Sequence, residues 1–309
     1  MQRWHTLAAH YNHKYGCRVQ KIPLDAGACC PNRDGTLSSD GCIFCNANGS
    51  GSGRAKRGDS LLQQWNALRA VYLRDDPNTR FIAYLQSFSN TYGPQKRLQQ
   101  LLQSVRSMPQ CFGVAVGTRP DCLDGPKLDT LAALNCDLWL ELGLQTAHDK
   151  TLHRINRGHD FACYQQTTRL ARERGLKVCS HLIVGLPGEG QGECLETLKQ
   201  VVETGVDGIK LHPLHIVKGS TMAKAWEAGR LNGIELDDYT VTAGEMIRHT
   251  PPEVIYHRIS ASARRPTLLA PLWCENRWTG MVELDRYLNE QGAQGSALGR
   301  SWVAPQSAK

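Results

Sequence analysis

Three cysteines, Cys30, Cys42 and Cys45, lie in one short stretch that reads CPNRDGTLSSDGCIFC. Thiolates are ligands of soft metal centres, and three of them leave a four-iron cluster one protein ligand short. An iron with an open position is able to bind a substrate or a cofactor, whereas a closed structural site normally uses four protein ligands. The spacing therefore favours a catalytic metal centre over a structural one.

The same cysteines are also compatible with a zinc site that is completed by Cys29 or by a distant histidine. Two observations favour an iron–sulfur cluster over zinc. The sequence has no second C-x-x-C pair that would close a zinc ribbon. Phe44, immediately before the third cysteine, offers an aromatic ring beside the open iron.

The composition is that of a globular protein, since 41% of the 309 residues are hydrophobic and 21% are charged. The sequence has no apolar run of the length that spans a membrane, and its N-terminus lacks the features of a signal peptide. We therefore expect a cytoplasmic protein in which most of the twelve cysteines are free thiols or metal ligands. The net charge of +7 is compatible with a nucleic-acid partner without requiring one.

Six apolar, strand-like runs alternate with helical patterns, and they begin near residues 18, 81, 111, 138, 177 and 208. Strands that are apolar on both faces and alternate with helices indicate a parallel sheet covered by helices. Six such units fit a partial (β/α)6 TIM-like barrel as readily as an open sheet. In either architecture the active site lies at the carboxyl ends of the strands, and the cysteine stretch directly follows the first of them.

The rhythm of the sequence changes after about residue 233. We expect residues 1–233 to form the core, including the cysteine loop. Residues 234–290 are expected to form a C-terminal α/β extension packed on that core, because ELDDYTVTAGEMIRH and LDRYLNEQG look helical and EVIYHRIS looks like a strand. Residues 291–309 are small and polar, and we predict a disordered tail there.

The segment KIPLDAGACCPNRDGTLSSDGCIFC resembles the cluster loop of the radical S-adenosylmethionine (radical SAM) superfamily. More narrowly, it resembles YhcC/YtqA-type proteins, which are related to the catalytic subunit of Elongator. The segments GTRPDCL, ELGLQTAHDKTLHRINRGHD, HLIVGLPGE, HPLHIVKGS and APLW add to this resemblance, which covers about residues 10 to 290. The fold that it implies is the partial (β/α)6 barrel of radical SAM enzymes.

The resemblance implies a 4Fe–4S cluster held by Cys30, Cys42 and Cys45, with Cys29 as the alternative to the first of these. SAM would bind the fourth iron through its amino and carboxylate groups. Reductive cleavage of SAM would then give a 5′-deoxyadenosyl radical that abstracts a hydrogen atom from the substrate. An electron donor such as flavodoxin or ferredoxin is implied with it.

The resemblance also suggests residues that bind SAM at the ends of the fourth and fifth strands. Gln145 resembles the residue that contacts the ribose or carboxylate of SAM, and Glu141 is expected to support it. The alternative is a buried polar pair satisfied by its neighbours. Ile183 and Gly185 belong to a motif that resembles the one on which the adenine packs.

Other cofactor contacts are expected around the same end of the sheet. The Gly-Gly-Glu motif that often follows the second strand is replaced here by LQSFSNTYG, so its role is expected to pass to backbone near Gln86 and Ser87. Phe44 and His212 complete the expected cofactor-binding set, although a structural hydrogen bond is the alternative for His212. Cys122 is a candidate thiol hydrogen donor, with an ordinary semi-buried cysteine as the alternative.

For the substrate we favour tRNA with a modified wobble uridine, because the resemblance to Elongator implies that position. Acetyl transfer from acetyl-CoA is not expected. The alternatives are a radical SAM enzyme that acts on a small metabolite or peptide, and a non-catalytic iron–sulfur protein that binds RNA or senses redox state. Phosphate contacts are expected from five basic residues: Arg54, Lys56, Arg57, Arg264 and Arg265.

Overall fold

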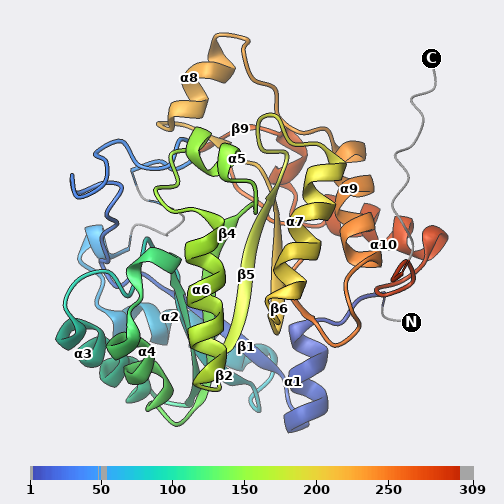
Figure 1. Cartoon of the computed structure of the whole chain (residues 1–309). Helices are drawn as coiled ribbons and strands as arrows, with labels where there is room; N and C mark the ends of the chain where they lie inside the picture. Colours follow the sequence, from blue (N-terminus) through green and yellow to red (C-terminus); the bar gives the residue numbers. More distant parts are fainter. Residues whose placement is uncertain (1–2, 48, 50–53, 300–309) are drawn as a thin grey trace, which may run out of the picture.

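The computed structural model describes residues 3–47, 49 and 54–299 (Figure 1). Within these residues, seven strands form one parallel sheet in the order β1-β2-β3-β4-β5-β6-β8, and β7 pairs antiparallel with β9. The strands are β1 (Val19–Leu24), β2 (Arg80–Leu85), β3 (Cys111–Thr118), β4 (Asp137–Gln145), β5 (Lys177–Val184), β6 (Gly208–Pro213), β7 (Ile216–Val217), β8 (Ile255–Arg258) and β9 (Leu268–Ala270).

The helices mostly connect consecutive strands of the sheet. The α-helices are α1 (Leu7–Tyr15), α2 (Leu61–Asp75), α3 (Gln95–Arg106), α4 (Gly125–Ala132), α5 (Asp149–Arg154), α6 (Phe161–Glu173), α7 (Gln191–Glu203), α8 (Thr221–Glu227), α9 (Leu236–Arg248) and α10 (Thr279–Gln291). Short 3-10 helices are η1 (Ala55–Arg57), η2 (Pro120–Cys122) and η3 (Leu272–Glu275). No helix of the described residues is long and apolar enough to cross a membrane.

Local sequence explains why the elements form where they do. Strand β4 is buried along almost its whole length, as expected of a strand covered on both faces. Helix α2 begins at Ser60, whose hydroxyl accepts a hydrogen bond from the backbone N–H of Gln63 in a capping box. Helix α6 begins at Asp160, whose carboxylate accepts a hydrogen bond from the backbone N–H of Cys163. The prediction of six strands alternating with helices is confirmed.

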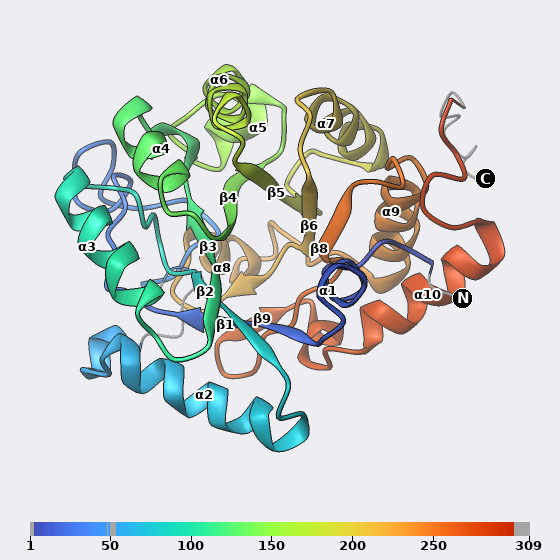
Figure 2. The same ribbon diagram turned by 90° about the horizontal axis from the view of Figure 1, so that it is seen from below.

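The sheet curls into a partial barrel. Viewed from below, its strands follow an arc whose convex side carries α2, α3, α4, α6, α7 and α9, and α1 lies at the gap between the first and last strands (Figure 2). Aromatic and polar side chains pack at the N-terminal ends of the strands, next to α1. Tyr11 of α1 donates a hydrogen bond to Asp137 at 2.9 Å and accepts one from the indole of Trp139 at 2.7 Å. The expected fold class, a partial barrel of the TIM-like type, is confirmed.

The sheet has one strand more than the six predicted. Strand β8 comes from the predicted extension and pairs in parallel with β6, through Gly208 with Ile255 and Ile209 with Tyr256. Its hydrogen bonds pair backbone N–H and C=O groups along the edge of β6, which a six-stranded sheet would leave unpaired. The segment EVIYHRIS was predicted as a strand, but its place in the main sheet was not, because β8 is separated from β6 by α8 and α9 rather than by one strand–helix step.

The predicted disordered tail is wrong for residues 291–299. The side-chain amide of Gln294 donates hydrogen bonds to the carbonyls of Pro251 and Val254, and its oxygen accepts from the N–H of His5 at 2.7 Å. Ala297 is buried. These contacts hold the segment against the N-terminal residues and against residues 248–254, whereas residues 300–309 lie outside the described residues. The boundary at residue 233 stays a prediction.

Candidate active site

The cysteine loop, defined here as residues 26–47, follows β1 at the carboxyl end of the sheet. The segment after α5, residues 155–158, holds it in place. The N–H of Ile43 donates to the carbonyl of Ile155 at 3.1 Å, and the amide of Asn156 donates to the carbonyl of Gly41 at 2.8 Å. The amide of Asn32 returns a bond to the Asn156 carbonyl at 2.5 Å. The loop is therefore fixed by side chains as well as by backbone.

A cavity of about 360 Å³ lies at this end of the sheet. Cys30, Cys42 and Cys45 line it, while Cys29 is exposed and is not among the lining residues. The cavity is where the sequence predicted an active site, and its lining favours Cys30 over Cys29 as the first of the three cysteines. Further lining residues come from strands or the segments directly after them: Gln86, Thr118, Gln145, Ile183, His212 and Arg258.

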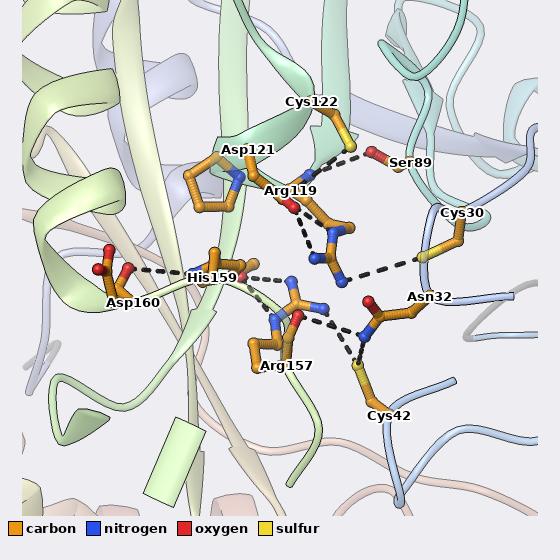
Figure 3. A network of polar contacts seen from close by, with 12 residues as sticks. Cys30, Asn32, Cys42, Ser89, Arg119, Asp121, Cys122, Arg157, His159 and Asp160 are labelled. Atoms are coloured by element: carbon orange, nitrogen blue, oxygen red, sulfur yellow. Dashed lines mark hydrogen bonds and ion pairs between the residues drawn. The ribbon is translucent and has the colours of Figure 1, made fainter. Parts of the chain in front are cut away.

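Nitrogen donors face two of the sulfur atoms of the loop, those of Cys30 and Cys42 (Figure 3). The guanidinium of Arg157 donates to Cys42 Sγ at 3.4 Å, and the amide of Asn32 donates to the same sulfur at 3.6 Å. Arg119 Nη1 lies 4.0 Å from Cys30 Sγ. A hydrogen bond from Cys45, together with the charges of Arg157 and Arg119, holds the pKa of the Cys42 thiol well below its ordinary value, although burial opposes this. These contacts favour the thiolate of Cys42, which is the form that binds metal. The hydrogen bond to Cys42, together with burial, raises the pKa of the Cys45 thiol well above its ordinary value.

The three cysteines fit an iron–sulfur cluster better than a single metal ion. Within the described residues, no three His, Cys, Asp or Glu side chains converge closely enough to hold one ion. A four-iron cluster binds each thiolate at a different iron, so its cysteines do not need to converge on one point. Hydrogen-bond donors to the sulfurs are also typical surroundings of such clusters.

Beneath the cysteine loop, the carboxylate of Glu141 is completely buried and binds four side chains. The ammonium groups of Lys21 and Lys210 both donate to it. His181 lies at 2.9 Å from the carboxylate and His257 at 3.3 Å. Burial alone would raise the pKa of Glu141, but the two lysines and the two hydrogen bonds hold it well below its usual range. The carboxylate is therefore ionised at neutral pH.

The groups around Glu141 respond to burial in the opposite way. Burial lowers the pKa of Lys210 to about 8 and that of His181 to about 4. Burial also lowers the pKa of His215 to about 4 and that of His212 well below its ordinary value. These imidazoles are neutral at pH 7, and the fixed positive charge in this part of the cavity comes from lysine and arginine.

Six of the residues predicted to bind cofactors line the cavity: Phe44, Gln86, Glu141, Gln145, Ile183 and His212. Gln145 has a φ of +88°, in the left-handed region that non-glycine residues rarely adopt, and the pairing of β4 with β5 shifts register beside it. A strained, irregular strand end of this kind re-aims a side chain, and it is frequent at functional sites.

Three other predicted residues do not line this cavity. Ser87 is buried, and its hydroxyl has no hydrogen-bond partner within the described residues. Gly185, with a φ of +95°, lines a separate hollow beside Ile234. Cys122 is buried next to Arg119 (Figure 3), and burial raises the pKa of its thiol to about 12. Contact between these residues and a cofactor stays a prediction.

The predicted basic residues lie in two segments next to the cavity lining. Arg54, Lys56 and Arg57 belong to the region of η1, where Lys56 donates to the carbonyl of Ala47 at 2.7 Å. Arg264 and Arg265 directly follow residues 261–263, which line the cavity. Arg265 pairs with Glu275 at 3.2 Å. An RNA contact through these residues stays a prediction.

Sequence reasoning missed the residues that surround Glu141. Lys21 and Lys210 lie inside strands of the sheet, and this position is a signal, because lysine is rarely buried without a partner. Arg258, at the end of β8, lines the cavity and has no carboxylate within ion-pair distance in the described part of the chain. It was missed because β8 was not expected in the sheet.

Comparison with known proteins identifies the class to which this fold and cavity belong. The model of the radical SAM superfamily matches residues 30–201, and that of the radical SAM C-terminal domain matches residues 206–290. The chain therefore belongs to the radical SAM superfamily. Members of this family use a 4Fe–4S cluster and SAM, and the chain is an enzyme of this kind.

Individual proteins within and beyond this family are similar to the chain to different extents. The chain is 66% identical to the protein YhcC of Escherichia coli K12 over 295 residues, which cover 94% of each chain. It is 40% identical to the uncharacterized protein YtqA of Bacillus subtilis, covering 94% of this chain and 91% of that one. Among solved structures, archaeal Elp3 from Methanocaldococcus infernus matches with a TM-score of 0.70 at 15% identity, over 89% of this chain and 64% of that chain. This last likeness shows the fold alone.

The buried cluster around Glu141 generates a stability prediction. Glu141→Gln leaves Lys21 and Lys210 without their counter-charge, and we expect it to lower the free energy of unfolding by about 3–5 kcal/mol. Chemical denaturation of the two proteins measures this difference. Lys210→Met alone should also destabilise, and the double variant should lose less than the sum of the two single losses, because it removes both members of a pair. Strictly additive losses of unfolding free energy would contradict an interaction between Glu141 and Lys210.

The buried histidines generate a prediction on pH. The pKa of His215 is about 4 in the folded protein and about 6.5 in the unfolded chain. Between these values only the unfolded chain binds the proton, so this residue lowers the free energy of unfolding as the pH falls from 6.5 to 4. Compared with the wild type, His215→Gln should lose up to about 3 kcal/mol less over this interval. Denaturation curves that stay parallel for the two proteins would refute this, and the exposed His13→Gln serves as control.

Proposed function

We propose that Cys30, Cys42 and Cys45 hold the 4Fe–4S cluster of this radical SAM enzyme. The observation that carries the proposal is that these three cysteines line one cavity at the carboxyl end of the parallel sheet, with N–H donors at two of their sulfurs. Cys29, next to Cys30 in the sequence, is exposed, so we do not assign it as a ligand of the cluster. The absence of a fourth cysteine from the lining leaves one iron for SAM.

The other lining residues would bind and orient the cofactor and the substrate. Gln145 and Gln86 offer amide groups for the polar parts of SAM, and Phe44 and Ile183 offer apolar contacts. When bound, the cluster and SAM supply reductive cleavage of the sulfonium and a 5′-deoxyadenosyl radical. The residues that line the cavity would orient the bound groups and limit the access of water to them.

We further propose that the substrate is a tRNA, with a modified wobble uridine at the cavity, in the cytoplasm. The support is the resemblance to the Elongator catalytic subunit and the excess of basic residues on the segments beside the cavity. Arg258 adds a cation within the cavity itself. A small metabolite or a peptide is the second candidate, since a cavity of about 360 Å³ also suits a small ligand.

The ligand assignment generates the first functional prediction. Anaerobically reconstituted wild type, reduced with dithionite and given SAM, should produce 5′-deoxyadenosine, measured by chromatography. Cys42→Ala should lose the cluster and produce none, because its iron loses its only protein ligand. Cys29→Ser is the matched control and should keep both the cluster and the product. Loss of both in Cys29→Ser, together with retention in Cys30→Ser, would reverse the assignment of the first ligand.

The tRNA proposal generates a binding prediction. Arg264→Ala and Arg265→Ala should each weaken binding of unmodified tRNA transcript and lower the slope of log K against log salt by about 1. Fluorescence anisotropy over a range of salt concentrations measures both quantities. Arg169→Ala on α6 is the control, because Arg169 is exposed in an ion pair with Glu173 away from the cavity lining. Wild-type binding that does not depend on salt would favour the small-substrate alternative.

A further inference from the structure

One cation beside the cysteine loop has no counter-charge. The guanidinium of Arg157 is buried, with 7% of the residue exposed, and no carboxylate of the described residues lies within ion-pair distance of it. Its N–H groups bind two acceptors. Nη1 donates to Cys42 Sγ at 3.4 Å, while Nε donates to the carbonyl of Gly143 at 3.2 Å, where Nη2 also donates. The charge is therefore directed at the sulfur without being neutralised.

Arg119 makes a useful contrast, because it approaches another cysteine of the loop with its charge already paired. Its Nε and Nη2 donate to the two carboxylate oxygens of Asp121 at 2.9 and 2.7 Å. Its remaining nitrogen, Nη1, lies 4.0 Å from Cys30 Sγ, at the limit of a hydrogen bond to sulfur. Figure 3 shows the two guanidinium groups side by side, one facing Asp121 and the other facing the sulfur of Cys42.

The position of Arg157 is determined by the backbone around it. Its N–H donates to the carbonyl of Leu152 at 2.9 Å, which closes the turn after α5. Gly143 provides the space for the guanidinium, because a Cβ at that position would lie 2.7 Å from Nη2. The Arg157 carbonyl also accepts from the amide of Asn32 at 3.3 Å. The arginine is thus held at one distance from the cysteine loop by the strand, the turn and the loop itself.

We propose that Arg157 is a positioning residue that raises the reduction potential of the cluster. The inference rests on the proposed assignment of Cys42 as a ligand. Reduction brings one electron to the cluster from a one-electron donor and makes its charge more negative by one, with no bond formed or broken at Arg157. A buried, unpaired cation and an N–H bond to the sulfur stabilise the more negative state, since both interactions grow with the charge on the sulfur. Arg119 contributes less because Asp121 offsets its charge.

The test is a potentiometric titration of the reconstituted protein without SAM, followed by the electron paramagnetic resonance signal of the reduced cluster. Iron and sulfide are quantified first in every variant. Arg157→Gln should lower the equilibrium constant for one-electron reduction about tenfold, which corresponds to about 59 mV. Arg157→Lys, which keeps the charge, should shift the potential less. Asp121→Asn should shift it in the opposite direction, because it releases the charge of Arg119 toward Cys30.

The controls separate this inference from the assignment on which it rests. Arg169→Gln, on an outer helix, should leave the potential unchanged. Full iron and sulfide in Arg157→Gln with an unchanged potential would overturn the inference and leave the ligand assignment intact. If Arg157→Gln loses iron, Asp121→Asn decides, and an unchanged or lowered potential in that variant overturns the inference. A wild type that takes up no cluster would overturn the ligand assignment itself.

Discussion

The buried carboxylate of Glu141 is the interaction on which the curl of the sheet depends. It lies on β4 and binds Lys21 of β1, His181 of β5, Lys210 of β6 and His257 of β8, so that five of the seven parallel strands meet at one charge. Transferring these charged groups out of water is costly, and the cost is offset only when all partners are in place. A flatter sheet would separate β1 from β6 and β8 and would leave buried lysines unpaired. The charge cluster therefore specifies the closed arc.

Above this cluster, the cavity is built from segments that the arc brings together. The cysteine loop follows β1. The segment that anchors it, residues 155–158, follows α5, which comes after β4 in the chain. Strand register determines which side chains face the cavity, because one step along a strand moves a side chain to the other face. Along β4, Glu141, Gly143 and Gln145 follow this alternation onto the cavity side, and the strained φ of Gln145 falls at the last of these positions.

The sequence was sufficient to predict the strands, the helices and the end of the sheet at which the site lies, because burial on both faces leaves long apolar runs. It was not sufficient to predict that Lys21, Lys210 and Glu141 meet, since that contact depends on the closure of the sheet across distant strands. Cys29 and Cys30 are equivalent by type and position, and only the course of the loop decides that Cys30 faces the cavity. The short β8 was misplaced for a similar reason, because its partner is far away in the sequence.

Strand β8 and the residues after it give the cavity a wall of separate origin. Arg258 and residues 261–263 come from the C-terminal part of the chain, whereas the three cysteines come from the loop after the first strand. The residues proposed to hold the cluster and this second wall therefore lie on or after the two opposite edge strands of the sheet, β1 and β8, and meet in one cavity. Replacing the segment after β8 would change the shape of this wall, while the side chains that contact the sulfurs of Cys30 and Cys42 come from other segments. The cysteine loop and the segment after β8 can therefore be altered separately in engineered variants.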